Sequence, residues 1–572
     1  MTTRARFAPW ATGWFPVLIL AVLLAAARVW YLAHACPYTL AEDEAFYWTW
    51  TKRPELSYYS KGPGVAWAIW TSIRYLGDTE LGVRLPAVIF SSLTMLAIGG
   101  LTFDVTGSRR AGMMAALCFA LAPMFQVLGL TMTIDGPYAF CWTLACWAGW
   151  RGLAQKSGPA LAMCGVMIGL GFAFKYTILL LLPGLIVFFL LRRREQRLPP
   201  VTVLWLIVAL GGVVAGMWPV VVWNQREGWP TLAHLLGHLG VEGGDKAASQ
   251  GVSGWHYDPT WTLGFVGSQV AAMGPALVLS VLALVRDRRE GADETRRRAT
   301  LFLLCTGLPP LAFYLLVSLA TPPKVNWALA GFLPLLSLAG REVVEAMDRV
   351  RGAPGATRLA RWSRALWFAA WIVGLGFALG TLRLDLISRG LEWLRAQPAL
   401  AKVIPAKAYI PLGRISGARE MGAHAGEIVA DLRRQTGRDP FVMAQHYGRS
   451  AQLEFYMPGR PLVLCASGYI DGGRRTQYDY WAQTDLRRRD DLIGRDALLV
   501  GGWSTAEWKP YFRNVELLGR LDGDGKPDRP AFIGRGFKGM GELHATPPDR
   551  DPSDHPGTYP PAPHPTLDGK GE

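Results

Sequence analysis

Long, uninterrupted apolar segments constrain the fold of this chain more than any other feature. Eleven of them recur between Trp14 and Arg383, each close to the ~20 residues that a helix needs to cross the hydrocarbon core of a bilayer. The composition agrees, because 51% of the 572 residues are hydrophobic and only 18% are charged. A soluble core does not require apolar runs of this length, so the sequence predicts a polytopic, α-helical membrane protein.

Basic residues between the apolar segments predict the topology. With Arg4 and Arg6 in the cytoplasm, alternation of the spans puts every strongly basic loop on the cytoplasmic side, as the positive-inside rule expects. The apolar run after Arg6 is longer than the core of a signal peptide, so we expect a retained first helix. The two runs on either side of Lys175 leave the count open by one or two helices. The predicted spans are residues 14–34, 85–103, 111–130, 137–152, 159–174, 177–191, 202–222, 261–285, 299–319, 325–340 and 366–383.

The net charge and the cysteines exclude two other classes of protein. A formal charge of +15 would suit a nucleic-acid-binding protein, but the basic residues lie in short runs between apolar segments, which argues against a nucleic-acid partner. Five of the seven cysteines lie inside apolar segments, so no disulfide framework is predicted. We expect a multi-pass protein of the inner (plasma) membrane that contacts membrane lipid.

The sequence predicts three regions along the chain. Residues 1–384 form the transmembrane domain, and an odd number of spans places residues 385–544 outside the cytoplasm. In this second region an amphipathic helix over 418–436 and buried strands near 441–445, 461–467 and 497–502 predict a small α/β domain. From about Ala545 the chain is rich in Pro, Asp and Gly, which predicts a disordered tail.

The first predicted outer loop begins with three carboxylates, Glu42, Asp43 and Glu44. Charged groups beside a membrane span lower the stability of the protein unless they face water, a cavity or a partner, so they are functional candidates. The alternative is that Asp43 and Glu44 cap a short helix over residues 45–52, since carboxylates favour a helix N-terminus.

The same loop continues with Tyr58, Tyr59 and a lone Lys61 in the turn Gly62-Pro63-Gly64. We interpret Lys61 as a phosphate-binding group and the tyrosines as substrate contacts. A lysine in a turn at the membrane surface can instead contact lipid headgroups.

Two further charges stand alone among apolar residues. Asp135 lies in an Asp-Gly-Pro turn between two spans, where ordinary turn chemistry is the alternative to a functional role. Lys175 has apolar residues on both sides, so it is either a residue that extends to the membrane interface or part of an anion site.

Polar groups also occur in the later predicted outer segments. Lys324, Asn326 and Trp327 lie in TPPKVNW, and Asn224 lies in WNQREGW, where the tryptophans could simply belong to the interfacial aromatic belt. The long loop after Trp223 has histidines and an acid without a tight metal-binding spacing, so the need for a divalent cation stays open and no ligand cluster supports one. These four residues are His234, His238, His256 and Glu242.

Taken together, the predicted outer face offers carboxylates for proton abstraction, separated cations for a phosphate, and aromatic faces for a sugar or a lipid. This combination suits group transfer from a membrane-anchored phosphate donor. No other cofactor is predicted.

The ordered set of motifs resembles one family. DEAFYWTW, ELSYYSKGPGVAW, GVRLPAVIFSSLT, TMTIDGPYAFCWTLA, FKYTILLLLPGL and WNQREGW occur in this order, as in bacterial integral-membrane glycosyltransferases related to protein O-mannosyltransferases and lipid A aminoarabinose transferase. The resemblance spans about residues 14–340. AREMGAHAGEI, HYGRSAQLEFYMPGRP and RRTQYDYW are similar to an outer domain that some members carry.

The resemblance implies the C-type glycosyltransferase fold and transfer of a sugar from a polyprenyl phosphate to a lipid, glycan or protein acceptor, with inversion. It implies that Asp43 is the catalytic base or positions the acceptor beside Glu44, that Asp135 is the acidic residue of the second outer loop, and that Lys61 lies near the donor phosphate. Our own hypothesis is that Lys175, Arg84 and Lys324 assist Lys61 in binding this phosphate. Many relatives have Tyr-Tyr-Asp-His-Pro-Pro in the first loop, where this chain has Ser60 in place of the carboxylate. Ser60 therefore favours phosphate recognition by Lys61 over a metal or acid role for the loop.

Two other functions remain open at this level. A transporter or flippase of a lipid-linked sugar would also need charges within the membrane, but no internal repeat is evident. A binding module on a membrane anchor would not need eleven helices.

Overall fold

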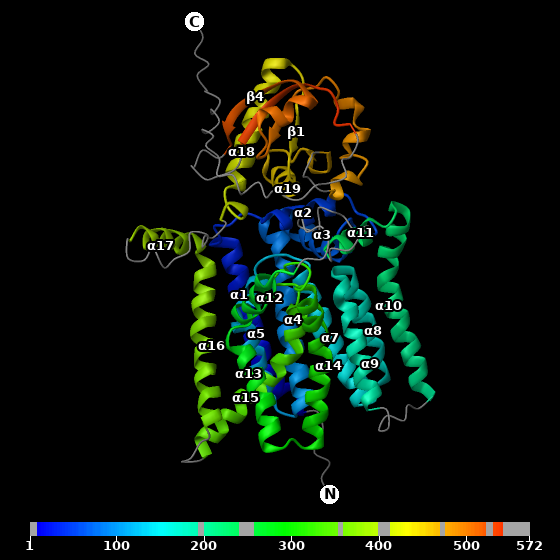
Figure 1. Cartoon of the computed structure of the whole chain (residues 1–572), viewed down its shortest axis with the longest axis vertical. Coiled ribbons are helices and arrows are strands. Elements are labelled where there is room, and N and C mark those ends of the chain that lie inside the picture. Colours follow the sequence, from blue (N-terminus) through cyan, green and yellow to red (C-terminus); the bar gives the residue numbers. More distant parts are fainter. Residues whose placement is uncertain are drawn as a thin grey trace. The chain divides into compact units, whose positions relative to one another are not determined.

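The structure is a computed structural model that describes residues 8–192, 200–238, 257–352, 358–397, 412–469, 475–521 and 530–541. It divides into two compact units (Figure 1). The helical unit comprises residues 1–36, 61–225 and 256–383, and the α/β unit comprises residues 37–60, 226–255 and 384–572. The predicted domain bounds stay predictions, and parts of two predicted outer loops belong to the α/β unit. The predicted tail lies outside the described residues.

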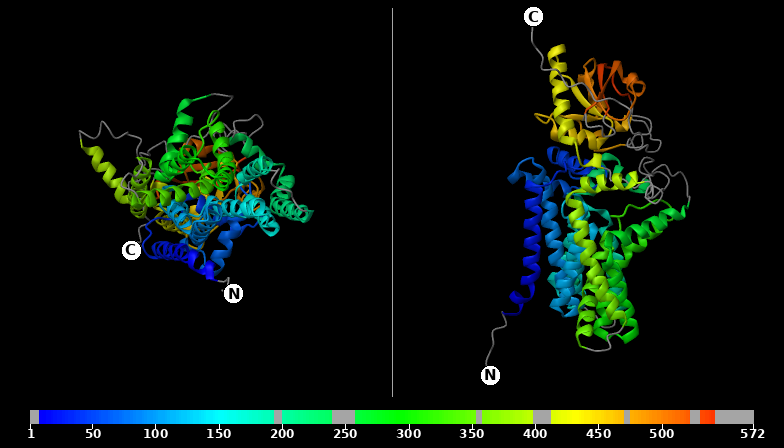
Figure 2. Two further views of the ribbon diagram at one scale, coloured as in Figure 1. Left: turned by 90° about the horizontal axis from the view of Figure 1, so that it is seen from below. Right: turned by 90° about the vertical axis from the view of Figure 1, so that its left-hand side faces the viewer.

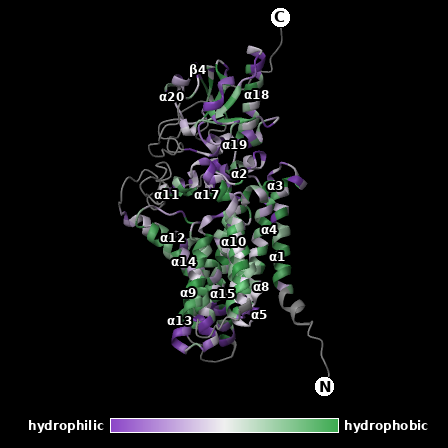
Figure 3. Ribbon diagram, turned by 90° about the vertical axis from the view of Figure 1, so that its right-hand side faces the viewer, coloured by the Kyte–Doolittle hydropathy of each residue, from purple (hydrophilic) through white to green (hydrophobic). Residues whose placement is uncertain are grey.

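Helices with continuous apolar sequence lie side by side in the helical unit, and hydrophilic residues gather at helix ends near α13 (Figures 1 and 3). Every predicted span is largely helical in the structure. The helices are α1 (Ala8–His34), α3 (Gly64–Leu76), α4 (Glu80–Thr106), α5 (Arg109–Leu121), α6 (Pro123–Leu128), α7 (Asp135–Gly149), α8 (Gly158–Phe174), α9 (Leu181–Leu191), α10 (Pro200–Glu227), α12 (Pro259–Met273), α13 (Pro275–Glu290), α14 (Glu294–Val317), α15 (Leu329–Gly352) and α16 (Arg358–Leu382).

Five helices among the described residues are long and apolar enough to cross a membrane by themselves: those in α1, α4, α10, α14 and α16. A sixth is added if the bent pair α12 and α13 is one span. The predicted membrane protein is thereby confirmed, and the count of eleven spans stays a prediction.

The predicted continuous span over 261–285 is wrong in one respect. It is divided into α12 and α13, which meet at an angle of 95° (Figure 2). The break falls at Gly274, whose φ of 56° is in the left-handed region, and Pro275 then begins α13. Proline cannot donate the backbone hydrogen bond that would continue α12, so the helix ends there.

Small residues let the helices of this unit approach closely. A Cβ added to Gly112 of α5 would lie 2.7 Å from the carbonyl oxygen of Gly99 in α4, and one added to Gly340 of α15 would lie 2.5 Å from the carbonyl oxygen of Ala111. Close approach of backbones at small residues is typical of helices packed in a membrane. They hold α4, α5 and α15 together around the apolar core.

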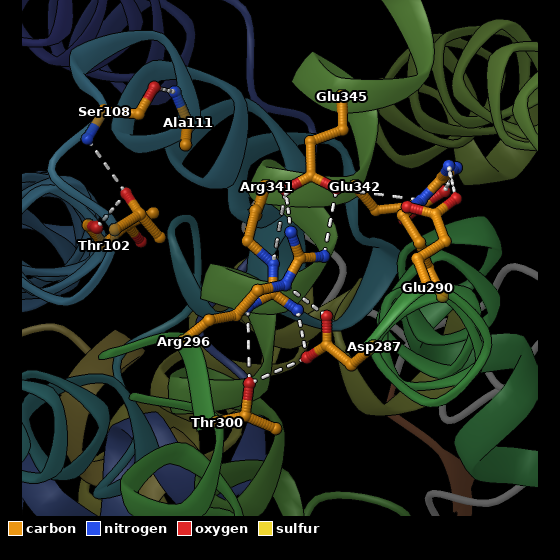
Figure 4. Close-up of polar contacts among 12 residues, drawn as sticks. Thr102, Ser108, Ala111, Asp287, Glu290, Arg296, Thr300, Arg341, Glu342 and Glu345 are labelled. Carbon is orange, nitrogen blue, oxygen red and sulfur yellow. Dashed lines mark hydrogen bonds and ion pairs between the residues drawn. The ribbon is translucent and has the colours of Figure 1, made fainter. Parts of the chain in front are cut away.

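A network of ion pairs joins α13, α14 and α15 at one end of the helical unit (Figure 4). Arg286 and Glu342 are fully buried, with Nη2 and Oε1 2.5 Å apart. Arg341 lies 2.7 Å from Asp287, and Arg296 lies 2.8 Å from Glu345. The sequence predicts that these arginines lie in basic cytoplasmic segments, and the structure shows that carboxylates of neighbouring helices pair with them. Buried charges require such partners.

The α/β unit combines a sheet with helices from three separate parts of the chain. Its elements are α2 (Glu42–Lys52), α11 (Pro230–His238), α17 (Leu384–Ala396), α18 (Ala418–Thr436), β1 (Phe441–Ala444), α19 (Tyr447–Tyr456), β2 (Val463–Cys465), β3 (Ala497–Val500), α20 (Thr505–Trp508), β4 (Phe512–Arg520) and β5 (Pro530–Phe537). The predicted helix over 418–436 and the three predicted strands are confirmed.

The five strands described form one mixed sheet in the order β2-β1-β3-β5-β4. Strands β1, β2 and β3 are parallel, and β5 is antiparallel to both β3 and β4. Side chains alternate between two cores: Val442 and Leu498 pack with α18, while Met443 and Leu499 pack with Trp508 on the other face. The sequence analysis missed β4 and β5. None of the seven cysteines, which all lie within the described ranges, forms a disulfide.

Candidate functional site

Three predicted site residues meet inside the helical unit. The Nζ atom of Lys175 lies 2.8 Å from Oδ1 of Asp135 and 3.4 Å from the carbonyl oxygen of Asn326. Nδ2 of Asn326 donates to Oδ2 of Asp135 at 2.6 Å. The side chains of Asp135 and Lys175 are 3% and 11% exposed. The cluster is therefore a nearly buried ion pair whose carboxylate also accepts an amide hydrogen bond.

Local sequence explains how these groups reach one another. Asp135 is in the first turn of α7, where the helix dipole favours a carboxylate. Lys175 has extended backbone, with φ −150° and ψ 121°, at the break between α8 and the 3₁₀ turn Tyr176–Leu180. Asn326 precedes α15. A break between two helices directs the lysine side chain inward instead of along a lipid-facing surface.

Aromatic rings and hydroxyl groups surround this cluster. Nζ of Lys175 lies 5.2 Å from the centre of the Tyr138 ring, a cation–π contact. Thr177 donates a hydrogen bond to the Tyr138 hydroxyl at 3.2 Å. The ring of Trp327, a predicted substrate contact, lies 5.5 Å from that of Tyr314. Sequence analysis missed Tyr138 and Tyr314 because aromatic residues within apolar spans look like core residues.

The turn that holds Lys61 packs against the end of α8. A Cβ added to Gly62 would lie 2.3 Å from the carbonyl oxygen of Ala173, and one added to Gly64 would lie 2.8 Å from the Phe174 ring. Glycine is required here for close approach, whereas the sequence suggested only a tight turn. Because α8 ends directly before Lys175, the two lysines predicted to bind phosphate stand on adjoining segments.

The other predicted donor and substrate residues of the helical unit occupy different environments. Arg84 is buried on α4, with Nη1 3.6 Å from the Cys36 sulfur. Asn224 is buried and donates to the Val220 carbonyl of its own helix at 3.0 Å. Lys324 is exposed. Their roles in donor or substrate binding stay predictions.

In the α/β unit, the first two acidic candidates have different environments. Oε2 of the buried Glu44 accepts a hydrogen bond from the Ala41 backbone at 2.9 Å, so the capping alternative explains this residue. Helix α2 begins at Glu42, three residues earlier than predicted. Asp43 is exposed, and its Oδ1 accepts a hydrogen bond from the Tyr447 hydroxyl at 3.0 Å. Asp43 is therefore the better candidate for proton abstraction.

The two predicted substrate tyrosines are packed within the α/β unit. Tyr58 stacks on Trp50 at 4.1 Å and donates to its carbonyl oxygen at 3.1 Å, and burial raises the pKa of the Tyr58 phenol. The backbone N–H of Tyr59 donates to Oε1 of Gln477 at 2.6 Å. Both contacts stabilise the loop, and substrate binding by these tyrosines stays a prediction.

The histidines of the third outer loop lie partly in the described region. His234 and His238 bring their Nε2 atoms to 3.1 Å on α11, whereas His256 and Glu242 lie outside the described residues. Among the residues that the structure describes, no group of three or more His, Cys, Asp or Glu side chains is arranged to hold a metal ion.

Comparisons with known proteins agree with this architecture. The family model for dolichyl-phosphate-mannose-protein mannosyltransferases matches residues 60–223. The lipid A galacturonosyltransferase RgtD of Rhizobium johnstonii is 25% identical over 406 residues, which are 70% of this chain and 74% of that protein. Crystal structures of ArnT from Cupriavidus metallidurans, bound to undecaprenyl phosphate and in the apo state, give TM-scores of 0.59 and 0.57. Each has 15% identity and covers 91% of this chain and 98% of ArnT.

The segment that matches the mannosyltransferase model includes Lys61, Arg84, Asp135 and Lys175. The likeness to ArnT extends over both units, although at 15% identity it shows the fold alone. Together these comparisons confirm the resemblance predicted from the sequence, to integral-membrane glycosyltransferases of the C-type fold.

Proposed function

We propose that this protein is a membrane glycosyltransferase that moves a sugar from a polyprenyl-phosphate donor to an acceptor. The observation that carries the proposal is the buried Asp135–Lys175–Asn326 cluster beside the Lys61 turn, within the segment that matches the mannosyltransferase model. RgtD is named for sugar transfer, and the ArnT structure contains undecaprenyl phosphate, which supports both the reaction and the donor class.

The donor side of the reaction needs cations more than it needs an acid. When the bond between the anomeric carbon and the phosphate oxygen breaks, the electron pair stays on the leaving polyprenyl phosphate. This anion is already stable, so Lys61 and Lys175 can stabilise the developing charge without transferring a proton. Asp135 and Asn326 hold the Lys175 ammonium group in one position.

The acceptor side needs a base. As the acceptor oxygen forms its bond to the anomeric carbon, its hydroxyl proton passes to the Asp43 carboxylate. General base assistance of this kind contributes typically about 10²–10⁴-fold to the rate. Attack opposite to the leaving phosphate inverts the configuration of the sugar.

We place the enzyme in the inner membrane, with the acceptor bound outside the cytoplasm, following the distribution of basic loops. Among lipid, glycan and protein acceptors we propose a glycolipid, because RgtD acts on lipid A. The transporter alternative has no support from these comparisons.

Reconstituted protein with radiolabelled undecaprenyl-phosphate sugars tests the proposal. Galacturonic acid, mannose and aminoarabinose are suitable first sugars, with lipid A as the acceptor. Label found on the acceptor supports a transferase, and label moved across the bilayer supports a flippase. If the label is neither transferred nor moved across the bilayer, both functions are refuted.

The substitution Asp43→Asn should lower the rate of transfer by about 10²–10⁴-fold while the folded protein is retained. Glu516→Gln, which changes an exposed carboxylate on β4, serves as the control and should retain activity. Full transfer by Asp43→Asn would show that Asp43 is not the base.

A further inference from the structure

The N-terminal end of α19 lies against the N-terminal end of α2 inside the α/β unit. The Tyr447 hydroxyl donates to Oδ1 of Asp43 at 3.0 Å. The Glu42 carboxylate faces two residues beside Tyr447: Nε of Arg449 lies 3.5 Å from Oε1 of Glu42, and Nδ1 of His446 lies 4.0 Å from Oε2 of Glu42. Two consecutive acids of the first loop thus face one short segment of the C-terminal domain, residues 446–449.

Close packing holds this contact in one register. A Cβ added to Gly448 would lie 2.4 Å from Cβ of Glu42, so only glycine lets α19 approach α2 at this point. The rings of Phe46 and Tyr447 are 4.6 Å apart. These contacts fix the Tyr447 ring on α2, one turn from Asp43.

Polar contacts with α19 anchor both ends of the first-loop segment 40–53, which contains α2. At the start of this segment, the Leu40 backbone N–H donates to the Tyr456 hydroxyl at 2.7 Å, and Nε2 of Gln452 donates to the Leu40 carbonyl at 2.9 Å. At its end, Arg53 pairs with the buried Glu454 at 2.8 Å. The helix α19 therefore holds both ends of this segment in place.

We propose that Tyr447 of α19 is a positioning residue for the Asp43 carboxylate, which gives α19 a role in proton abstraction from the acceptor. The inference rests on the proposed role of Asp43 as the base. An exposed aspartate samples several rotamers, and a base contributes only when it is within hydrogen-bond reach of the acceptor hydroxyl. The Tyr447 hydroxyl holds Oδ1 and leaves Oδ2 to accept the proton.

The substitution Tyr447→Phe tests this arrangement, because it removes one hydroxyl and keeps the ring against Phe46. We expect kcat for sugar transfer to fall about 10- to 100-fold, since a hydrogen bond to a charged group is lost and the base is misplaced. The KM for undecaprenyl-phosphate sugar should be unchanged. In the Asp43→Asn background the same substitution should have no further effect on the residual rate, because both act through one carboxylate.

Tyr456→Phe is the matched control, because it weakens the anchoring of the same loop by α19 without touching Asp43. It should retain kcat, and thermal unfolding should report the folding of both variants. An equal loss of kcat in the two variants would show that Tyr447 is only structural and would overturn the inference. An unchanged kcat in Tyr447→Phe would also overturn the inference.

The proposed function fails separately from this inference. Full activity of Asp43→Asn would refute the assignment of Asp43 as the base. A strongly impaired Asp43→Asn together with a fully active Tyr447→Phe would refute only the positioning role of Tyr447.

Discussion

The ion pair between Asp135 and Lys175 allows a test that separates folding from phosphate binding. The two groups are 2.8 Å apart, with side chains 3% and 11% exposed. Removing one partner of such a buried pair leaves an uncompensated charge and typically costs about 3–5 kcal/mol. Asp135→Asn and Lys175→Met should therefore each destabilise the protein by roughly this amount.

The two single substitutions should differ in a definite order. After Lys175→Met the carboxylate keeps the amide hydrogen bond of Asn326 at 2.6 Å. After Asp135→Asn the ammonium keeps weaker contacts, with the Asn326 carbonyl oxygen at 3.4 Å and the Tyr138 ring at 5.2 Å. Asp135→Asn should be the more destabilising of the two. The double substitution removes both charges, so its stability should return to within about 1–2 kcal/mol of the wild type.

Unfolding midpoints in detergent and binding of undecaprenyl phosphate measure the two effects. If Lys175 binds the donor phosphate, the double variant should be folded and yet bind undecaprenyl phosphate at least tenfold more weakly, since about 1.4 kcal/mol lost from a phosphate contact is a factor of ten. Asp348→Asn is the control, because its pair with Arg110 is half exposed, with side chains 50% and 55% exposed, and should be worth less than about 1 kcal/mol. Single substitutions as harmless as this control would refute the energetic argument, and unchanged lipid binding by the folded double variant would refute the phosphate role.

Two further predictions concern the Lys61 turn and the α/β domain. Gly62→Ala should weaken binding of undecaprenyl phosphate severalfold, because its Cβ would lie 2.3 Å from the backbone oxygen of Ala173 and force the turn away from α8. Gly211→Ala, with nothing within 4 Å of its Cβ, should leave lipid binding unchanged, and equal binding in both variants would contradict the packing argument. Burial raises the pKa of Asp479 to about 7 from an ordinary value of 3.8, so the folded state favours the protonated carboxyl group. The contribution of Asp479 to stability is therefore fully present below pH 3.8 and is lost as the pH rises towards 7. Unfolding midpoints of Asp479→Asn between pH 5 and 8 should depend less on pH than those of the wild type, and identical pH profiles would contradict the assignment.

Hydropathy, which is a local property, was enough to predict the helices. Each apolar run must satisfy its backbone hydrogen bonds internally in a bilayer, so helices could be placed without knowledge of their neighbours. The same argument could not foresee the 95° bend at Gly274, although glycine followed by proline was visible, because many apolar helices contain both. The alternation of β4 was also too weak to be recognised, since much of that strand is exposed.

The candidate residues were identified singly because each was unusual in its surroundings. Asp135, Lys175 and Asn326 were notable as polar groups beside apolar spans. Lys175 is 40 residues from Asp135 and 151 residues from Asn326 in the sequence, so their contact could not be predicted locally. Tyr447 lies in the quoted motif HYGRSAQLEFYMPGRP, but nothing local marked it as a site residue, since a tyrosine at the start of a helix is ordinary.

The sequence by itself determined that the chain enters a membrane, where its helices run and which charges are out of place, because hydrophobicity and charge act over a few residues. Only the tertiary structure decided which charges neutralise one another, that Gly62 and Gly64 bring the Lys61 turn against α8, and that Tyr447 holds Asp43. These contacts depend on how distant segments pack, and the free energy that selects one packing is shared among many residues far apart in the chain.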